Sequence, residues 1–523
     1  MTAAAGSPLN IPIFRSLWVA TIVSNVGTSM QDVGSGWLMT SLSSDSLMVA
    51  LVQAATTLPM FVLSLPAGAL ADLVDRRRLL IATQLWTIAA AATLSITTFA
   101  GLVGPVLLLV LIFAIASGLS LGAPAFQATV PELVPTSLLP QAVSLNSLGI
   151  NIARAVGPAI GGLVIGAASP AAVFGLNAAS TIGVIVVLFR WKRERREISL
   201  PEEHFVEAVR TGIEYSLQSI EVLTVLIRGV GFFFFASGFL ALLPVVGRRE
   251  LALSPTGYGW LLTLMGLGAV TGALVVPWIC DRISSNRLTI LASLLFTVAT
   301  VLLGEATSFA SAAPIVVGAG SAWIVIMSSL AGAAQMAAPA WVRARVLAIY
   351  ILSSQGAMMS GSILWGWIAS HASIESALLA AGVGLAASQL LALIFPLDLT
   401  AKLDLSPDPH WPAPLVAGQV EDDRGPVLIT IEYQIDPARL AEFARAMSPM
   451  RRIRRRDGAS SWGLFEDAAQ PGLVVETFVV RSWVEHLRQH QRVTHADREN
   501  EDAANRFHVG SAPPLVRHWI APA

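Results

Sequence analysis

The chain has little cysteine and little charge, and both shortages restrict its class. A single cysteine, Cys280, excludes an internal disulfide. Charged residues make up 13% of the 523 residues, against about 25% in soluble domains. The formal net charge of −1 argues against nucleic acid as a partner. We expect no cleavable signal peptide, because residues 1–10 are small and polar and the first apolar run is too long for one.

Apolar sequence is abundant, at 54% of all residues, and the charge is unevenly placed. Residues 401–523 hold 32 of the 67 charged residues, so residues 1–400 are far poorer in charge. The tail therefore has the composition of a soluble domain, whereas the rest has that of a polytopic membrane protein.

Apolar runs of about 20 residues are long enough to cross a bilayer as helices. Twelve such runs follow one another with short loops, so neighbouring helices are expected to be antiparallel. The even number places both ends of the chain on one side of the membrane. The predicted spans are residues 14–40, 47–70, 79–101, 104–127, 142–166, 170–190, 222–247, 255–279, 287–306, 311–335, 344–369 and 373–397.

The distribution of Arg and Lys predicts which side is cytoplasmic. The loops on one side contain only Arg248 and Arg249, so that side is expected to face outward. Both termini and the tail are then cytoplasmic. The loops on the cytoplasmic side contain Arg15, Arg76, Arg77, Arg78, Lys192, Arg193, Arg195, Arg196, Arg282, Arg287, Arg343 and Arg345.

The spans form two six-helix halves, residues 1–190 and 222–399. Residues 191–221 join them, and within this linker residues 202–218 are predicted to form an amphipathic helix along the inner surface. Its apolar positions have i, i+4 spacing: Phe205, Val209, Ile213 and Leu217.

The two halves echo each other in sequence. Gln127–Pro131 recurs as Gln335–Pro339. At one constant offset, Gly157, Gly162 and Ser169 match Gly361, Gly366 and Ser373. Parallel repeats with a binding site between them are an architecture of membrane transporters.

Residues 400–426, rich in Pro and Asp, are predicted to be a linker, and residues 427–523 a small α+β domain. Its predicted elements follow the order β-α-β-β-α-β of a ferredoxin-like fold. They are strand Val427–Tyr433, helix Pro437–Arg456, strands Ser460–Glu466 and Leu473–Val480, helix Trp483–Asn505 and strand Leu515–Ile520.

A short charged turn at residues 68–78 separates two apolar runs. Gly68, Asp72, Arg76 and Arg77 resemble the signature loop between helices 2 and 3 of major facilitator superfamily transporters. The resemblance implies a cytoplasmic gate that closes when the site opens outward. Leu73 departs from the pattern, since a basic residue often follows the Asp. A plain positive-inside loop would explain the arginines but not Gly68 and Asp72.

The second half has a degraded copy of this loop. Asp281 and Arg282 are its counterparts, with Pro277 in place of the glycine and Arg287 further on.

The predicted span 142–166 contains the string Gly157, Pro158, Gly161, Gly162. It resembles a motif of exporters in the superfamily, where it is associated with proton antiport, so the resemblance favours efflux. The alternative is close helix packing through small residues.

Two charged residues lie well inside predicted spans. Arg154 lies ~18 Å into its helix, and Asp32 lies ~27 Å along the first, at ~1.5 Å per residue. A carboxyl removed from water can take up and release a proton, so Asp32 is the first candidate for coupling. Arg154 would tune it or bind an anionic group. A direct pair would need helix tilt or a water, because the depths differ by ~9 Å.

Polar neighbours extend both positions into stripes. Asp32 shares a helix face with Thr21, Asn25, Thr28 and Ser35, and Arg154 shares one with Ser147, Asn151 and Pro158. We name Asp32, Arg154, Asn25, Thr28 and Asn151 as candidates for proton coupling or the substrate cavity. Two alternatives stay open: Arg154 is a structural arginine, and Asp32 lies at the outer mouth.

The second half is aromatic instead of charged. Phe232–Phe235 lie in one span, and no acid or base is placed at the middle of these helices. Aromatic walls suit a lipophilic substrate. The stronger alternative is that most of these rings face lipid or form interfacial belts. The other aromatic residues are Trp260, Trp278, Trp323, Tyr350, Trp365 and Trp367.

In the tail, His486 and His490 have the i, i+4 spacing of a metal-binding pair. A third ligand at His495 would fall off that face, so we favour a solvated or dimer-facing helix and predict no metal site. Arg456–Ala459, Trp462–Phe465 and Glu485–His490 look like the tail of transmembrane secretion effectors, a superfamily branch similar to enterobactin exporters. The resemblance covers nearly the whole chain.

The function expected is proton-driven export of a small lipophilic or siderophore-like molecule across a bacterial inner membrane. The resemblance implies alternating access, with the bilayer, the substrate and protons as partners and no cofactor. The tail is a candidate homodimer contact. We predict no enzyme, since no nucleophile, metal or acid–base constellation is evident. Three alternatives are an uptake symporter, an oxygenase-like tail enzyme and a membrane scaffold.

Overall fold

The computed structural model describes residues 7–191, 205–280, 282–397, 404–408, 410, 411, 414, 421 and 423–522. Two compact units make up the chain. The first contains residues 1–200, 227–329 and 351–395, and the second contains residues 201–226, 330–350 and 396–523. The predicted basic run Lys192–Arg196 and the gate residue Asp281 lie outside the described residues.

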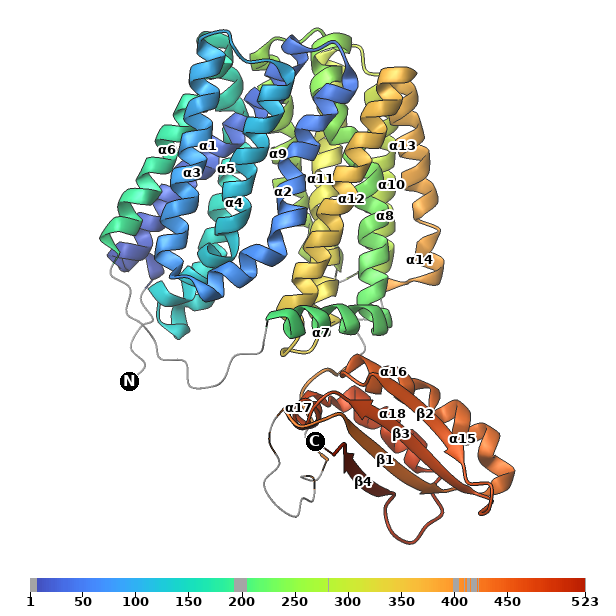
Figure 1. Cartoon of the computed structure of the whole chain (residues 1–523). Helices are drawn as coiled ribbons and strands as arrows, with labels where there is room; N and C mark the ends of the chain where they lie inside the picture. Colours follow the sequence, from blue (N-terminus) through green and yellow to red (C-terminus); the bar gives the residue numbers. More distant parts are fainter. Residues whose placement is uncertain are drawn as a thin grey trace. The chain divides into compact units, whose positions relative to one another are not determined.

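Helices lie in all twelve predicted ranges, and the last range is divided between α13 and α14 (Figure 1). The ends differ most at α13, which stops at Ser388, and at α4, which continues past its apolar core to Leu133. The helices are α1 (Pro12–Leu42), α2 (Ser46–Leu73), α3 (Arg76–Phe99), α4 (Pro105–Leu133), α5 (Leu139–Ala167), α6 (Pro170–Arg190), α8 (Ile220–Val245), α9 (Pro255–Cys280), α10 (Ser285–Gly304), α11 (Phe309–Met336), α12 (Arg343–His371) and α13 (Ile374–Ser388), which is followed by the short α14 (Leu391–Ile394).

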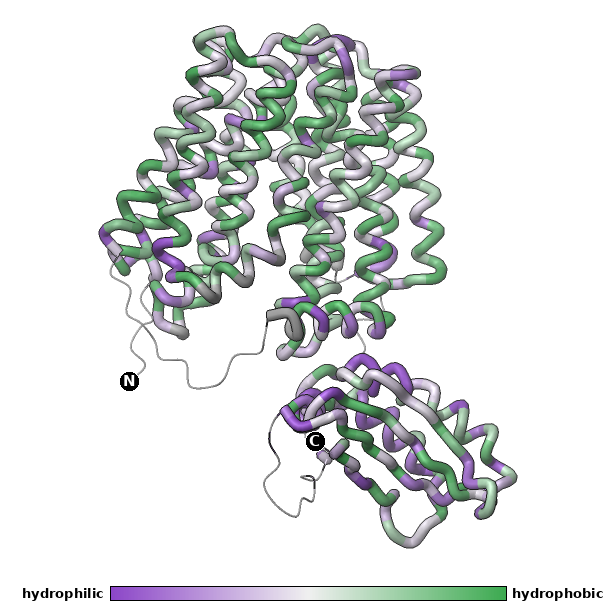
Figure 2. Tube along the Cα trace, in the orientation of Figure 1, coloured by the Kyte–Doolittle hydropathy of each residue, from purple (hydrophilic) through white to green (hydrophobic). Residues whose placement is uncertain are grey.

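Among the described residues, eleven helices are long and apolar enough to cross a membrane. Hydrophobic residues run along their whole length (Figure 2). The exception among the predicted spans is α1, because Arg15, Asn25, Gln31 and Asp32 lower its hydropathy. In the first half, α1 packs against α5 and α6, and α4 packs against α2 and α3.

The repeated serines and the first pair of repeated glycines have equivalent places in the two halves. Ser169 accepts a hydrogen bond from the backbone at the start of α6, and Ser373 does the same at the start of α13. Gly157 of α5 lies against Ser29 of α1, and Gly361 of α12 lies against α8.

The second pair of glycines joins the two halves. A Cβ on Gly162 of α5 would lie 2.9 Å from the Cα of Gly259 in α9. Gly366 of α12 lies against Ala50 of α2. The internal repeat therefore produces two related helix crossings, α5 with α9 and α2 with α12, at which backbones approach closely.

The tail folds around a four-stranded antiparallel sheet with strand order β2-β3-β1-β4. Each of its two predicted helices is divided. Pro449 starts a new helix after Met447, and Thr494 caps another through a reciprocal pair with Asp497. The elements are β1 (Val427–Gln434), α15 (Leu440–Ala446), α16 (Ser448–Arg456), β2 (Ser461–Glu466), β3 (Leu473–Val480), α17 (Trp483–Arg492), α18 (His495–Asn505) and β4 (Leu515–Ile520).

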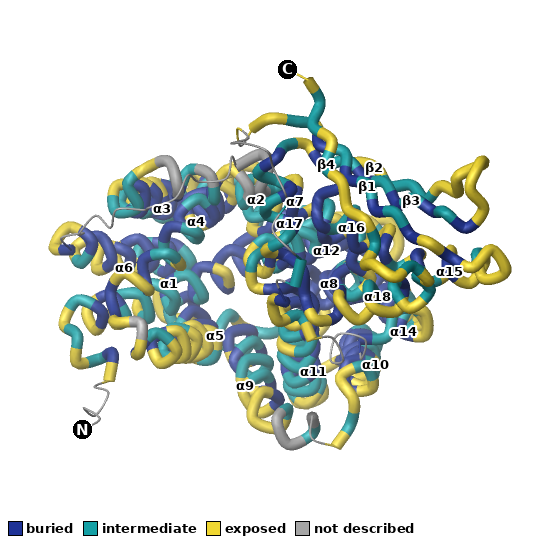
Figure 3. The backbone as a smooth tube through the Cα atoms, turned by 90° about the horizontal axis from the view of Figure 1, so that it is seen from below, coloured by how far each residue is buried: buried dark blue, intermediate teal, exposed yellow. Residues whose placement is uncertain are grey.

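The helices of the tail cover one face of this sheet. Alternate residues of β1 are buried, and Figure 3 marks such positions in dark blue. They pack with Phe443, Met450 and Trp483 from the helices. Period-two alternation on a half-covered sheet is the pattern expected of such a layer.

A buried ion pair crosses the tail core. Arg454 of α16 donates to Glu476 of β3, with 3.1 Å between Nε and Oε1, and the two side chains are 2% and 0% exposed. Trp462 Nε1 donates to the same carboxylate at 2.9 Å, and the Tyr433 hydroxyl donates at 3.3 Å. The carboxylate is therefore fully occupied by donors.

Replacing Glu476 with Gln is expected to destabilise the tail by about 3–5 kcal/mol, because the Arg454 charge stays buried without a counter-charge. Hydrogen exchange of tail peptides in the full chain would measure this loss. The matched control is Glu442→Gln in the exposed Arg439–Glu442 pair, where about 0–1 kcal/mol is expected. Equal losses in the two variants would contradict the buried-pair argument.

The amphipathic helix α7 (Phe205–Gln218) belongs to the second unit with the ends of α11 and α12. Residues 202–204 of the predicted helix lie outside the described residues. Tyr215 packs edge-on against Trp341 with ring centroids 5.6 Å apart, and the Arg456 guanidinium lies over Tyr215. Ile213 and Leu217 of the apolar stripe are exposed. One face of α7 is thus fixed by protein, while Ile213 and Leu217 are left uncovered.

Candidate functional site at the contact of the two halves

Asp32 lies on the one exposed side of a largely buried stretch of α1. Residues 33–40 are buried and so is Gln31, whose Oε1 accepts a hydrogen bond from Asn177 of α6 at 2.6 Å. The Asp32 side chain is accessible to solvent. Helix α1 is therefore held by α6 on one face and presents its carboxylate on another.

Arg154 is exposed on α5, as is Asn151 one turn earlier. The positive charge of Arg154 acts electrostatically on Asp32. Between these two described side chains the structure forms no direct ion pair. The two charges therefore interact electrostatically without a direct hydrogen bond between them.

The other predicted polar residues of α1 have more local contacts. Thr28 donates to the carbonyl of Ser24 at 3.1 Å, within the helix. Asn25 is half-buried.

The second half contributes a group that the sequence did not reveal. Tyr258 of α9 is buried and lies within electrostatic range of Asp32. Its ring stacks on that of Trp37 in α1, with ring centroids 5.7 Å apart. A Cβ on Gly36 would lie 3.2 Å from Pro244 of α8. Arg154 of the first half and Tyr258 of the second therefore both lie within electrostatic range of Asp32.

Arg248, which follows α8, ties the two halves together near this site. Its guanidinium lies 5.0 Å from the Trp37 ring centroid and donates to Thr40 at 3.2 Å and to Ser41. Asp45 makes a second link by accepting a hydrogen bond from Ser370 of α12 at 2.6 Å. From the sequence, Arg248 indicates only the outer side of the membrane, because its hydrogen-bond partners are more than 200 residues away in the chain.

The arginines of the 68–78 loop bind within the first half. Arg76 pairs with Glu132 of α4 at 2.8 Å. Arg77 donates to the backbone oxygens of Leu188 and Phe189 in the last turn of α6, at 2.7 and 2.8 Å. Asp75 caps the start of α3. The side chain of Asp72 lies outside the described part of the chain, as does Asp281.

Arg77→Ala is expected to lower the stability of the protein by about 1.5–3 kcal/mol, because it removes charged hydrogen bonds to the end of α6. Thermal unfolding in detergent would show the loss as a lower midpoint. Arg78→Ala is the matched control, since Arg78 is the exposed neighbour in the same loop. Equal midpoints for the two variants would refute this role.

The small residues of α5 face two neighbours. Gly157 and Gly161 lie against α1, where a Cβ on Gly161 would be 3.0 Å from the Cα of Met30. Gly162 and the carbonyl of Pro158 lie against Gly259 of α9. This motif therefore packs α5 between the helix of Asp32 and the helix of Tyr258.

The aromatic residues of the second half divide into two groups. Phe232 and Phe233 are buried and pack against Phe296 and Trp323, with ring centroids 5.5 and 5.6 Å apart. Trp260 and Trp367 are about half exposed. The expectation that most of these rings face lipid is thus wrong for Phe232 and Phe233, which form an internal aromatic core.

A buried cation in α8 was also missed by the sequence argument. Arg228 is 4% exposed and donates to Asn286 of α10 at 2.9 Å and to the carbonyl of Phe395 at 3.3 Å. It lies ~12 Å into its helix, at ~1.5 Å per residue. Its hydrogen bonds join α8 to two other helices of the second half.

Solved structures of similar fold include proteins named as transporters. The chain is similar to a bacterial homologue of the human lysosomal transporter Spinster in an inward-facing conformation, with 11% identity and a TM-score of 0.58 over 76% of this chain and 98% of that one. It is also similar to a POT family transporter in complex with 5-aminolevulinic acid, with 13% identity and a TM-score of 0.62 over 74% and 96%. The chain shares the fold of these two proteins.

The profile of the transmembrane secretion effectors matches residues 3–523, and the chain belongs to this family. It is 26% identical to the staphyloferrin A transporter of Staphylococcus aureus over 53% of this chain and 70% of that protein. Identity is also 26% with the enterobactin exporter EntS of Escherichia coli O1:K1, over 56% and 70%. The multidrug efflux pump Tap of Mycolicibacterium fortuitum is 25% identical over 77% and 100%. The resemblance predicted from the motifs is confirmed, and the protein is a multi-pass membrane transporter.

Proposed function

We propose that the chain is a proton-coupled exporter in the inner membrane of a bacterium, with both termini cytoplasmic. Helix α1 is the twelfth span, and its polar residues line the transport path instead of facing lipid. The two halves, residues 1–190 and 222–399, rock against each other at the α5–α9 and α2–α12 crossings. The tail, residues 427–523, has the strand order of a ferredoxin-like domain.

The observation that supports this proposal best is the position of Asp32. It is an accessible carboxylate in a helix interior, within electrostatic reach of Arg154 in its own half and of Tyr258 in the other. The Asp32 carboxylate can accept a hydrogen bond from a donor group of the substrate, and a proton on Asp32 weakens that bond. Proton and substrate therefore compete for Asp32, while Arg154 holds an anionic group of the substrate.

The contacts of Arg248 and Asp45 support an inward-facing state in which the outer side is closed. In this state Arg76 and Arg77 are bound within the first half. Opening to the outside would break the Arg248 contacts and bring the 68–78 loop to the second half, near Asp281 and Arg282. Asp72 would act there as a gating residue.

A small lipophilic or siderophore-like molecule is the substrate class that the relatives favour, because two are named for siderophores and one for multidrug efflux. An anionic siderophore would also suit Arg154. A thermal-shift screen of the purified protein with metal-free siderophores and lipophilic cations would select the transported probe.

Direction of transport separates export from uptake. In inverted membrane vesicles energised to acidify their lumen, an exporter accumulates the selected probe, whereas an uptake symporter does not. Vesicles without the protein give the background. Wild-type vesicles that only release a preloaded probe on energisation would overturn the export proposal.

A further inference from the structure

Three histidine side chains converge in the tail from two elements far apart in sequence. His486 and His490 lie one turn apart on α17, and His518 lies on β4. One ring nitrogen from each lies within 4.8 Å of the others. The Nε2 atoms of His486 and His490 are 3.3 Å apart. Nitrogen ligands at about 2.0–2.1 Å in a tetrahedral site lie about 3.3 Å apart, so this pair has ligand spacing.

Contacts with neighbouring side chains fix the orientation of the His486 and His490 rings. His486 Nδ1 faces the side-chain oxygen of Gln489 at 3.4 Å, and Gln489 itself donates to the carbonyl of Asp457. The ring of His490 packs edge-on against the ring of Trp411, with ring centroids 5.1 Å apart. An outer partner that accepts the proton of one ring nitrogen leaves the other nitrogen as a lone-pair donor, as in known metal sites.

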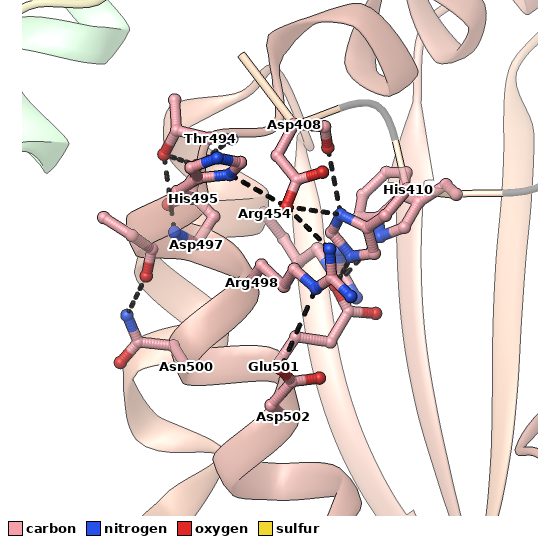
Figure 4. A network of polar contacts seen from close by, with 12 residues as sticks. Asp408, His410, Arg454, Thr494, His495, Asp497, Arg498, Asn500, Glu501 and Asp502 are labelled. Carbon is pink, nitrogen blue, oxygen red and sulfur yellow. Dashed lines mark hydrogen bonds and ion pairs between the residues drawn. The ribbon is translucent and has the colours of Figure 1, made fainter. Parts of the chain in front are cut away.

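Trp411 lies in the linker before the domain, and contacts with α18 hold it in place. Trp411 Nε1 donates to Glu501 of α18 at 2.8 Å, and His410 contacts the same carboxylate at 3.2 Å. Asp408 pairs with Arg498 and with His495, at 3.1 and 2.9 Å (Figure 4). His495, the third ligand considered from sequence, is therefore engaged in this network, and His518 takes the third position of the cluster.

The electrostatics of the cluster favour neutral rings. Burial lowers the pKa of His486 to about 3, and the neighbouring His518 and His490 lower it further. Burial also lowers the pKa of His490 to about 4 and lowers that of His518. Arg454 adds positive potential nearby, but its charge is paired with Glu476. Three imidazole rings therefore share one small volume, with one nitrogen of each within 4.8 Å of the others.

We propose that His486, His490 and His518 bind one divalent transition-metal ion of the Zn²⁺ type and leave a further coordination position open. Three neutral nitrogen donors suit Zn²⁺, Ni²⁺ or Cu²⁺, whereas Mg²⁺ and Ca²⁺ prefer oxygen. The burial of His486 corrects the expectation of a solvated helix face, and the proposal departs from the expectation that the tail holds no metal site. The site lies in the tail and does not depend on the proposed transport function.

The test uses full-length protein purified in detergent without a polyhistidine tag. After chelation and removal of the chelator, titration with Zn²⁺ should give one tight site per chain. X-ray absorption of the Zn²⁺-loaded protein should show three imidazole nitrogens at about 2.0–2.1 Å. His518→Ala and His490→Gln should each weaken binding by more than about 100-fold, since even outer partners cost 10–100-fold.

His495→Gln is the matched control, because this histidine neighbours the cluster but contacts Asp408, and it should bind Zn²⁺ as the wild type does. Thermal unfolding without metal checks that each variant is folded. If a variant does not fold, the X-ray absorption spectrum of the Zn²⁺-loaded wild type still tests whether three imidazoles bind the metal. Weak binding at several sites, oxygen-only coordination, or an affinity unchanged in His518→Ala would overturn the proposal.

Discussion

Asp32→Asn is expected to abolish transport driven by a pH gradient while leaving substrate exchange intact. Asparagine has nearly the same shape as aspartate but cannot take up a proton, so the link between proton and substrate is lost. Alternating access itself does not require the proton when substrate is present on both sides. Proteoliposomes with an imposed gradient measure the first activity, and counterflow of labelled probe measures the second.

The split between the two activities distinguishes coupling from damage. An unfolded or misassembled variant would lose both, and a residue at the outer mouth would lose neither. Glu305→Gln, at the exposed end of α10, is the control acid and should leave both unchanged. Gradient-driven transport by Asp32→Asn at the wild-type rate would remove Asp32 from the mechanism. Arg154→Ala should instead weaken probe binding, which the thermal shift reports.

Gly162→Leu is the second substitution with a large expected effect. A Cβ at this position would lie 2.8 Å from the Pro255 carbonyl oxygen and 2.9 Å from the Gly259 Cα, and both contacts are backbone atoms that cannot rotate away. Overpacking of this kind costs about 1–3 kcal/mol or more. Because the contact joins α5 to α9, we expect transport at background level together with a lower unfolding midpoint.

Gly332→Leu in α11 provides the matched control, since among the described residues no atom outside its own stretch of helix lies within 4 Å of a Cβ built there. It should keep the wild-type midpoint and transport rate. If Gly162→Leu behaves like Gly332→Leu, the two helices do not need a close approach at this crossing and the rocking contact must lie elsewhere.

The positions of the membrane helices could be predicted because one physical requirement, apolar length, determines them. The exact ends could not, since helices such as α4 and α5 continue into polar sequence. Helix α1 shows the limit of that signal. Its length and position were predicted from sequence, yet its polar residues keep it below the hydropathy of the other spans.

The tail was predicted in its order of elements but not in its helix breaks. Two local signals were present in the sequence: Pro449 starts a new helix after Met447, and Thr494 with Asp497 forms a capping box. Neither signal outweighs the surrounding sequence, which favours helix throughout.

Contacts between distant elements were the least predictable part of the candidate site. Tyr258 and Arg248 reach α1 only because the two halves meet there, and neither has a local motif. His518 could not be predicted as a third ligand, because it lies on β4 and not on the helix of His486 and His490. The available signal in the sequence was the period-two alternation of a strand, which places His518 and Ile520 on the same face. In the structure both residues are partly buried on the face toward the helices.

The central claim, that substrate moves outward in exchange for protons, has one direct measurement. Wild-type proteoliposomes are loaded with the selected probe and a trapped pH indicator, with equal pH inside and outside, and are then diluted into probe-free buffer. Antiport predicts that the lumen acidifies as the probe leaves, and that Asp32→Asn abolishes this signal. Alkalinisation of the lumen would indicate symport, and efflux without any pH change would show that transport is not coupled to protons.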